Sequence, residues 1–393
     1  MTLRDILFIE PYDGGSHRAF REQLAACSGH RFTALTLPAR FWKWRMRGSA
    51  VWFADRLAAD PPARCDLLMA TGFVNVADLR GLLPPTLQGV PILLYMHENQ
   101  LTYPLSPEEE FDFHFGFTNI LSCLAADRVV FNSAWHRAIF LDSLPDYLAR
   151  MPEAVPSGVR ERLEHKSTVC AVGLDRAALP ADHFPQYRGG PCDPGVGPTW
   201  PRGGARPLLL WNHRWEFDKR PEVFAGAVHR LLDDGLDFAV ALVGDPRAEH
   251  PAFLALRDRL GDRCEAFGLV PSRADYDALL ARADVVVSCA AQEYFGISVA
   301  EAVHAGAYPV LPRAQVYPSL YGTRCKGRHF YDDGDQAQLA ALLADLVRGR
   351  GCGHVCSLDR DVDAFCWPRL GPVWDDLLDA AAGGAAPGEG GRR

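Results

Sequence analysis

The sequence predicts an α/β protein built from two Rossmann-like domains, each a doubly wound parallel sheet. Short apolar runs alternate with helical segments in both halves of the chain, which is typical of βαβ units. The length of 393 residues accommodates two domains of ordinary size. A stretch rich in proline and glycine at 177–206 separates the halves. Because such sheets bind ligands at the carboxyl ends of their strands, we expect the domains to face a central cleft.

Shifts in composition place the expected domain boundaries. We expect an N-terminal domain at 1–176, a linker at 177–206 and a C-terminal domain at 207–366. A helix at 367–382 is expected to pack back across the domains. The remaining residues, 383–393, have the composition of a disordered tail.

Charge and composition exclude several classes of protein. The net charge of −8 argues against a protein that binds nucleic acid through its overall charge, so any RNA contact needs a local basic patch. No apolar run approaches the roughly 18 residues of a membrane span, and no signal peptide is evident. The 11 cysteines show no paired spacing and are typical of reduced core residues. We therefore expect a cytoplasmic protein without a membrane partner.

The first half begins with a strand, a turn with two glycines and a helix. The strand at 6–9 leads to Gly14 and Gly15, and a helix follows at 18–26. A glycine pair lets the backbone approach a ligand closely, although a tight turn without a ligand has the same pattern. Further strands are expected at 31–37, 65–70, 91–96, 128–131 and 168–173, and helices at 111–126 and 134–141.

One segment of the first half is strongly basic and aromatic. Cations that hold phosphates and aromatic faces that stack on unpaired bases are what binding to an exposed loop of RNA needs. A helix with core tryptophans and solvated cations is the alternative. The residues concerned are Arg40, Trp42, Lys43, Trp44, Arg45 and Arg47.

Four polar residues follow the predicted strand at 91–96, namely His97, Glu98, Asn99 and Gln100. Polar side chains at the carboxyl end of a parallel strand are costly to bury unless they line a binding site or are hydrogen-bonded. His97 can hydrogen-bond a reacting sugar, and the two amides offer neutral donors and acceptors. A purely structural cluster is the alternative.

The second half begins with a strand at 207–211, and Arg214 and Lys219 lie in the loop before a helix that starts at Pro221. A guanidinium and an ammonium at this place can bind a diphosphate and stabilise its charge as it leaves. Two solvated surface cations are the alternative. Further strands are expected at 238–244 and 265–270, with helices after Ser272 and at 335–348. The turn at 268–271 can frame a nucleobase through its backbone.

The segment 284–310 predicts a strand, a loop, a helix and a second strand. Glu293 lies in the loop and Glu301 in the helix, with an E-x7-E spacing. The amides of Gly296 and Ile297 open the helix and can face a phosphate. Glu301 can accept hydrogen bonds from sugar hydroxyls. A loop carboxylate and a solvated helix carboxylate are the alternative.

A zinc site is a further hypothesis for Cys352, His354 and Cys356, with Cys366 as a fourth ligand. The spacing matches no closed zinc module, so we predict that the protein holds no metal.

Six blocks of the sequence together resemble the tRNA-queuosine α-mannosyltransferase family. They are PYDGGSHRAF, LPARFWKWRMRGSA, YMHENQLTYP, FGFTNILSCLAADRVVFNS, WNHRWEFDKRPE and QEYFGISVAEAVHAGAYPVLP. More broadly, Arg214 and Lys219 together with the E-x7-E motif resemble the donor site of retaining GT-B glycosyltransferases. The proline- and glycine-rich stretch and the cysteine-rich tail lie outside the pattern of the family.

The resemblance implies a GT-B fold and transfer of mannose from GDP-mannose to the cyclopentenediol of queuosine in a tRNA anticodon loop. It implies retention of the anomeric configuration, no cofactor and no catalytic metal. By position, Arg214 and Lys219 would bind the diphosphate, Glu301 the ribose and Glu293 the donor sugar. We expect front-face transfer assisted by the leaving diphosphate.

Carried over residue by residue, the resemblance defines three sets. The catalytic set is His97, Arg214, Lys219 and Glu293. The donor-binding set is Gly14, Gly15, Arg214, Lys219, Val270, Glu293, Phe295, Gly296, Ile297 and Glu301. The acceptor and RNA-binding set is His17, Arg40, Trp42, Lys43, Trp44, Arg45, Arg47, Glu98, Asn99 and Gln100.

Alternatives stay open at this point. A GT-B enzyme can use another nucleotide sugar, and no side chain in FGLVPS distinguishes guanine from uracil. The acceptor can be a lipid or a polysaccharide, although no basic amphipathic helix favours a membrane surface. A protein that binds a nucleotide sugar without transferring it is the third alternative.

Overall fold

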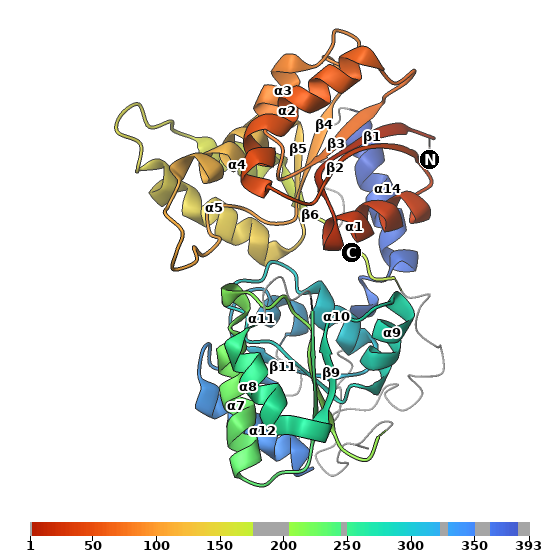
Figure 1. Cartoon of the computed structure of the whole chain (residues 1–393). Helices are drawn as coiled ribbons and strands as arrows, with labels where there is room; N and C mark the ends of the chain where they lie inside the picture. Colours follow the sequence, from red (N-terminus) through yellow and green to blue (C-terminus); the bar gives the residue numbers. More distant parts are fainter. Residues whose placement is uncertain (1, 176–203, 245–249, 323–328, 350–361, 384–393) are drawn as a thin grey trace. The chain divides into compact units, whose positions relative to one another are not determined.

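The computed structural model describes residues 2–175, 204–244, 250–322, 329–349 and 362–383. The chain divides into two compact units: the first runs to Gly173 and resumes at Trp367, and the second runs from Leu174 to Cys366 (Figure 1). Each unit is a parallel α/β domain, so the predicted fold class is confirmed. Most of the expected linker at 177–206 and of the tail at 383–393 lies outside the described residues.

The first unit contains a six-stranded parallel sheet in the order β2-β1-β3-β4-β5-β6. Its strands are β1 Asp5–Asp13, β2 Arg31–Pro38, β3 Leu67–Thr71, β4 Ile92–Met96, β5 Arg128–Phe131 and β6 Ser167–Val169. Its helices are α1 Gly15–Cys27, α2 Trp42–Ala59, α3 Val76–Leu82, α4 Phe113–Ala125, α5 Ala134–Leu148, α6 Val159–Lys166 and α14 Trp367–Ala382.

Helices cover both faces of this sheet, which is why its central strands read as continuous apolar runs. On β1, Leu7 and Ile9 belong to the core cluster that includes residues of α2 to α6. Phe8 points to the other face, where its ring lies 6.4 Å from that of Phe20 on α1. Figure 1 shows α1 and α14 together on one side of the sheet, and α2, α3 and α4 on the other.

Helix α14 belongs to the first unit. The indole of Trp374 is buried, lies 5.2 Å from the ring of Tyr95 and donates to the carbonyl of Ala171 at 3.2 Å. Trp367 donates to the side chain of Gln23 at 2.8 Å. Trp367 and Trp374, both buried, thus anchor α14 in the core of the first unit.

The second unit contains a six-stranded parallel sheet in the order β12-β11-β10-β7-β8-β9. Its strands are β7 Leu208–Trp211, β8 Ala239–Val243, β9 Cys264–Gly268, β10 Val285–Val287, β11 Tyr308–Pro312 and β12 Phe330–Tyr331. Its helices are α7 Pro221–Asp233, α8 Pro251–Leu260, α9 Arg273–Arg282, α10 Ile297–His304, α11 Tyr317–Tyr321 and α12 Gln336–Val347.

Each sheet reverses its strand order once. In the first unit β1 lies between β2 and β3, and in the second unit β7 lies between β8 and β10. At such a switch point the connections leave to opposite faces, which opens a crevice at the carboxyl ends of the two strands. The polar residues predicted to bind ligands should therefore gather after β1 and β3 in one unit, and after β7 and β10 in the other.

Some element boundaries differ from those expected from the sequence. β1 continues past Ile9 through Glu10 to Asp13, because Glu10 is hydrogen-bonded rather than solvated. Ser133 caps α5, whereas the side chain of Asn132 bonds the side chain of His136 and the carbonyl of His97, both at 2.8 Å. Over the described residues, no helix is long and apolar enough to span a membrane.

Candidate functional site

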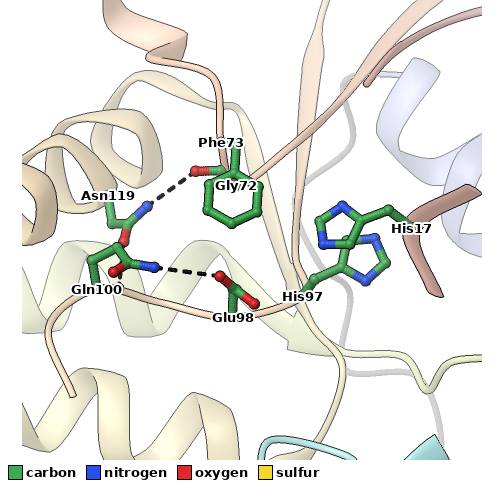
Figure 2. A pocket seen from close by; sticks show the side chains of 7 residues that line it. All are labelled: His17, Gly72, Phe73, His97, Glu98, Gln100 and Asn119. Atoms are coloured by element: carbon green, nitrogen blue, oxygen red, sulfur yellow. Dashed lines mark hydrogen bonds between the residues drawn. The ribbon is translucent and has the colours of Figure 1, made fainter. Parts of the chain in front are cut away.

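A pocket lies at the switch point of the first unit. It is lined by His17, Gly72, Phe73, His97, Glu98, Gln100 and Asn119 (Figure 2). The imidazole rings of His17 and His97 stack with their centroids 4.0 Å apart. Figure 2 shows these two rings on one side, with Glu98, Gln100 and Asn119 on the other. The structure thus brings together predicted residues that are distant in sequence.

Asn119 holds the far wall of this pocket in place. Its side chain accepts from the amide of Gln100 at 2.7 Å and donates to the carbonyl of Gly72 at 3.1 Å. The side chain of Gln100 donates to Glu98 at 3.4 Å. These bonds join the loop after β4 to the loop after β3, so the pocket is built before any ligand arrives.

Glu10 is a buried carboxylate beside the pocket that the sequence analysis missed. It is 0% exposed, and it accepts from Thr71 Oγ1 at 3.0 Å and from the amide of Tyr12 at 2.9 Å. Both of its oxygens lie 3.3 Å from Nδ1 of His17. A charged residue directly after an apolar strand was the available signal, because a carboxylate there must find partners.

The two histidines of the pocket have opposite proton affinities. Burial lowers the pKa of His17, but the Glu10 carboxylate more than offsets this, so that the pKa lies above its usual value. Burial, reinforced by the charge on His17, lowers the pKa of His97 well below its usual value. Nε2 of His97 is buried and has no hydrogen-bond partner among the described residues. At neutral pH His97 is therefore a neutral imidazole.

Three other predicted residues of the first unit have structural roles. The side-chain oxygen of Asn99 accepts from the amides of Leu101 and Thr102 at 3.0 and 3.1 Å, which builds the turn after β4. A Cβ on Gly14 would lie 2.5 Å from that of Ala39, so close packing requires this glycine. Gly15 has a φ of +52°, which favours glycine at the start of α1.

The basic and aromatic segment lies at the start of α2, which begins at Trp42. Phe41 and Trp44 are 70% and 64% exposed, so Trp44 is not a core residue. Trp42 is half-buried, and its ring centroid lies 5.2 Å from that of Phe115.

The cations of the same segment form ion pairs, a hydrogen bond and a ring contact within the protein. Lys43 pairs with Glu109 at 2.8 Å, and Arg47 pairs with Asp112 at 2.6 Å. Arg45 donates to a backbone carbonyl at 3.2 Å, and the guanidinium of Arg40 lies 5.8 Å from the ring of Phe41. The surface around Trp44 is therefore aromatic with partly neutralised charge.

Lys219 is the buried cation at the switch point of the second unit. It is 7% exposed, and its ammonium lies 2.7 Å from the carbonyl of Gln292, 3.1 Å from Asp218 and 3.2 Å from Glu293. These three acceptors match its three N–H donors. Burial lowers the pKa of Lys219, but the two carboxylates more than offset this and leave it raised. Contact with a diphosphate would require Lys219 to exchange one of these partners.

Arg214 is the more accessible of the two predicted cations. Its side chain is 42% exposed and pairs with Glu216 at 2.9 Å, and it lies 3.9 Å from the buried Asp218. Its guanidinium can turn towards an anion while Lys219 remains 3.1 Å from Asp218. His213, the preceding residue, is buried, and burial together with the charge of Lys219 lowers its pKa to about 4.

Glu293 is fixed at both of its oxygens. One oxygen accepts from the amide of Gly296 at 3.0 Å and the other pairs with Lys219 at 3.2 Å. Burial raises the pKa of Glu293, but attraction to Lys219 and His213 outweighs burial and lowers it overall. The Gly296 amide, predicted to face a phosphate, is thus occupied by Glu293, whereas Ile297 opens α10 as expected.

Glu301 lies on α10 and bonds a residue that the sequence analysis missed. Arg273 of α9 donates to it at 2.7 Å and also pairs with Asp277 at 2.8 Å. Burial raises the pKa of Glu301, and this outweighs the attraction to Arg273. Only tertiary packing reveals Arg273, because nothing in its local sequence links it to the E-x7-E motif.

Two further predicted donor residues lie apart from this cluster of charges. Val270 lines a second pocket together with 266–269 and residues of α9, which places the turn at 268–271 beside an open space. Phe295 is 3% exposed, and its ring packs edge-on against Phe365 at 5.1 Å. The side chain of Phe295 therefore belongs to the core, and only its backbone can contact a ligand.

Two groups of potential metal ligands occur among the residues that the structure describes. In the first, Glu10, His17 and His97 offer atoms within 4.8 Å of one another. The Glu10 carboxylate already has three partners, namely Thr71, the amide of Tyr12 and His17, which disfavours a metal.

In the second group, the potential ligands are His304, Asp363 and Cys366, again within 4.8 Å of one another. This group joins the last turn of α10 to the segment before α14. Cys352, His354 and Cys356 lie outside the described residues, so the zinc hypothesis for them and Cys366 stays untested.

Comparison with known proteins agrees with this arrangement. Residues 5–174 match the family model described as tRNA-queuosine alpha-mannosyltransferase N-terminal, and residues 200–356 match that of glycosyl transferases group 1. The chain is 35% identical over 324 residues to the tRNA-queuosine alpha-mannosyltransferase of Drosophila melanogaster, covering 80% of this chain and 81% of that protein.

Solved structures show the same fold at low sequence identity. Sucrose-phosphate synthase from Thermosynechococcus elongatus superposes with a TM-score of 0.66 and 17% identity, over 97% of this chain and 100% of that one. Anabaena Alr3699/HepE, solved in complex with UDP and glucose, gives a TM-score of 0.61 and 17% identity, over 96% of this chain and 100% of that one. These likenesses establish a GT-B fold.

Proposed function

The chain belongs to the tRNA-queuosine alpha-mannosyltransferase family, and from that premise we propose that it transfers mannose from GDP-mannose to queuosine in the anticodon loop of a tRNA. The anomeric configuration of mannose is retained. The alternative within the same fold is another nucleotide sugar as donor, or a lipid or polysaccharide as acceptor.

The observation that supports binding of the nucleotide sugar is the ion pair of Lys219 and Glu293, 3.2 Å apart at the switch point of the second sheet. Open α/β sheets bind ligands at this place. Lys219 keeps Glu293 ionised despite burial, so that the carboxylate can accept hydrogen bonds from hydroxyls of the sugar. Glu301, held by Arg273, offers a second carboxylate for the ribose.

In the proposed reaction no metal takes part, so positively charged side chains must stabilise the leaving group. As the bond between the anomeric carbon and the phosphate oxygen breaks, negative charge develops on that oxygen. Arg214 is exposed enough to move onto it, and Lys219 adds its charge from a fixed position. The proton of the attacking hydroxyl passes to the leaving phosphate oxygen on the same face, which gives retention. A glycosyl adduct isolated on Glu293 would contradict this front-face step.

The acceptor side rests on the pocket of the first unit and on the surface near Trp44. Neutral His97 and the amide of Gln100 suit hydroxyl groups of the cyclopentenediol. Exposed Phe41 and Trp44 suit stacking on unpaired bases of an anticodon loop. We place the reaction in the cytoplasm, where tRNA and nucleotide sugars occur together.

The test is a transfer assay with labelled GDP-mannose and tRNA that contains or lacks queuosine. Digestion to nucleosides should show the label on queuosine alone. The double variant Glu293→Gln/Glu301→Gln should lose this transfer, whereas Glu222→Gln, an exposed carboxylate in the first turn of α7, should keep it. Chelation with EDTA should leave the rate unchanged.

Other outcomes would replace parts of the proposal. Label from a different nucleotide sugar on the same nucleoside would change the donor and keep the acceptor. Transfer to vesicle lipids or to a polysaccharide, with none to tRNA, would make the alternative acceptor the leading one. Nucleotide-sugar binding without transfer to any acceptor would indicate a catalytically inactive protein.

A further inference from the structure

The surroundings of His17 leave one edge of its imidazole ring for a ligand. Its Nδ1 edge faces the Glu10 carboxylate at 3.3 Å. The ring stacks against His97 at 4.0 Å and against Phe73 at 5.6 Å. Tyr12 packs edge-on at 5.9 Å. Among the described residues, hydrogen-bond partners are found for Nδ1 only, so Nε2 is the nitrogen left to the pocket that His17 lines.

The hydrogen bonds of Glu10 fix its carboxylate beside Nδ1 of His17. The carboxylate is 0% exposed, its Oε1 accepts from Thr71 of β3, and the same oxygen accepts from the amide of Tyr12. A carboxylate on Nδ1 keeps a proton on that nitrogen and leaves Nε2 to the ligand. Buried carboxylates of this kind orient histidines rather than react themselves. The transfer step described above makes no use of Glu10.

We propose that Glu10 is a positioning residue, whose carboxylate holds His17 as an imidazolium, with Nδ1–H towards Glu10, so that Nε2–H donates a hydrogen bond to a non-reacting hydroxyl of the acceptor. The pocket thereby becomes a subsite for a vicinal diol: His17 binds one hydroxyl and leaves the other to be glycosylated. The identity of the acceptor rests on the proposed function, whereas the coupling between Glu10 and His17 does not.

The pH dependence follows from the groups that face His17. These are Glu10 and Asp13 from β1, and Glu98 and His97 from the loop after β4. The pKa of His17 is raised, so the donating form is present below that pKa and is lost as pH rises through it. The value of kcat/KM for the acceptor should fall over that range. Without the Glu10 charge, the pKa of His17 drops and the fall moves to lower pH.

The experiment compares Glu10→Gln with Asp13→Asn, which removes a carboxylate from the same strand that makes no hydrogen bond to His17. We expect Glu10→Gln to raise the acceptor KM about 10- to 100-fold near neutral pH, as for a lost charged hydrogen bond, with the donor KM unchanged. Histidine NMR, assigned with His17→Asn, should show a lower pKa for His17 in Glu10→Gln and a smaller change in Asp13→Asn.

A second pair of variants covers the case in which Glu10→Gln does not fold. His17→Asn keeps an amide near the Nδ1 position but has no group at Nε2, whereas His17→Gln places an amide nitrogen near Nε2. We expect His17→Asn to lose acceptor affinity and His17→Gln to keep part of it. Equal acceptor KM values in these two variants would overturn the inference, as would an unchanged KM and pH profile in Glu10→Gln. If no tRNA is glycosylated at all, the proposed function fails, and an unshifted pKa of His17 in Glu10→Gln overturns the coupling by itself.

Discussion

Replacement of Lys219 by methionine should destabilise the second unit strongly near pH 7. The ammonium is 7% exposed and faces Asp218, which is 0% exposed, and Glu293. Methionine fills a similar volume, so that the main effect is the loss of the charge. Removal of one partner from a buried ion pair costs about 3–5 kcal/mol, because the remaining charge is left without compensation. We expect the free energy of unfolding to fall by that amount.

The pH dependence of this loss identifies its cause. In the wild type the folded-state pKa of Glu293 is depressed, so its contribution to stability is present above the unfolded pKa near 4.5 and is lost as pH falls through the folded pKa. In Lys219→Met, burial acts without its counterion and raises the pKa of Glu293. Its ionised form then destabilises the fold at neutral pH, and protonation relieves this as pH falls. The difference between the two proteins should therefore shrink from about pH 7 to about pH 5.

Urea unfolding, followed by the fluorescence of the buried tryptophans of the second unit, measures both effects. The double variant Lys219→Met/Glu293→Gln should regain at least about 1 kcal/mol, since one uncompensated charge is removed. As a control, Arg348→Ala breaks an exposed pair with Asp234 and should cost less than about 1 kcal/mol. A loss below about 1 kcal/mol for Lys219→Met at pH 7, or a loss equal at both pH values, would refute the reasoning.

Three further predictions concern other parts of the site. Arg273→Ala should weaken GDP binding about tenfold in calorimetry, because Glu301 loses the partner that orients it and the pKa of Glu301 rises further. Tighter binding would mean that Arg273 competes with the ligand. Trp44→Ala should weaken tRNA binding by about 1–3 kcal/mol in a filter assay and leave stability unchanged. Trp52→Ala on the same helix, where Trp52 is 39% exposed, should leave tRNA binding unchanged. Equal effects on tRNA binding would argue against stacking. Gly14→Ala should lower the unfolding free energy by about 1–3 kcal/mol, because its Cβ would lie 2.5 Å from a neighbouring Cβ; an unchanged midpoint in urea would show that the turn relaxes freely.

Local pattern was enough to predict the central part of the second unit. The helix expected to open at Gly296 and Ile297 is α10 Ile297–His304, and the strand expected at 128–131 in the first unit is β5 Arg128–Phe131. β-Branched runs and a helix after glycine are local signals, and both elements are enclosed by the core as those signals require. Motif spacing likewise pointed to Lys219 and Glu293, which the fold brings to 3.2 Å.

Local pattern does not reveal a residue's partner where that partner comes from another element. Lys43 and Arg47 were candidates for RNA binding, and the structure pairs them with Glu109 and Asp112, which precede α4. The tryptophans of the basic segment were expected either to stack on RNA bases or to lie in a core, and tertiary packing leaves Trp44 exposed on α2. A side chain's available hydrogen bonds depend on the neighbours that folding supplies, and those neighbours are not adjacent in sequence.

The sequence by itself determined the α/β class, the family and the residue types of the donor site, because periodicity and motif spacing are properties of the chain alone. The tertiary structure decided which of these groups already form hydrogen bonds or ion pairs within the protein. It pairs Glu10 with His17, places three acceptors around Lys219 and joins Arg273 to Glu301. The physical reason is that strand order sets which loops meet at each switch point, and only burial beside a particular partner fixes the charge and direction of a titratable side chain.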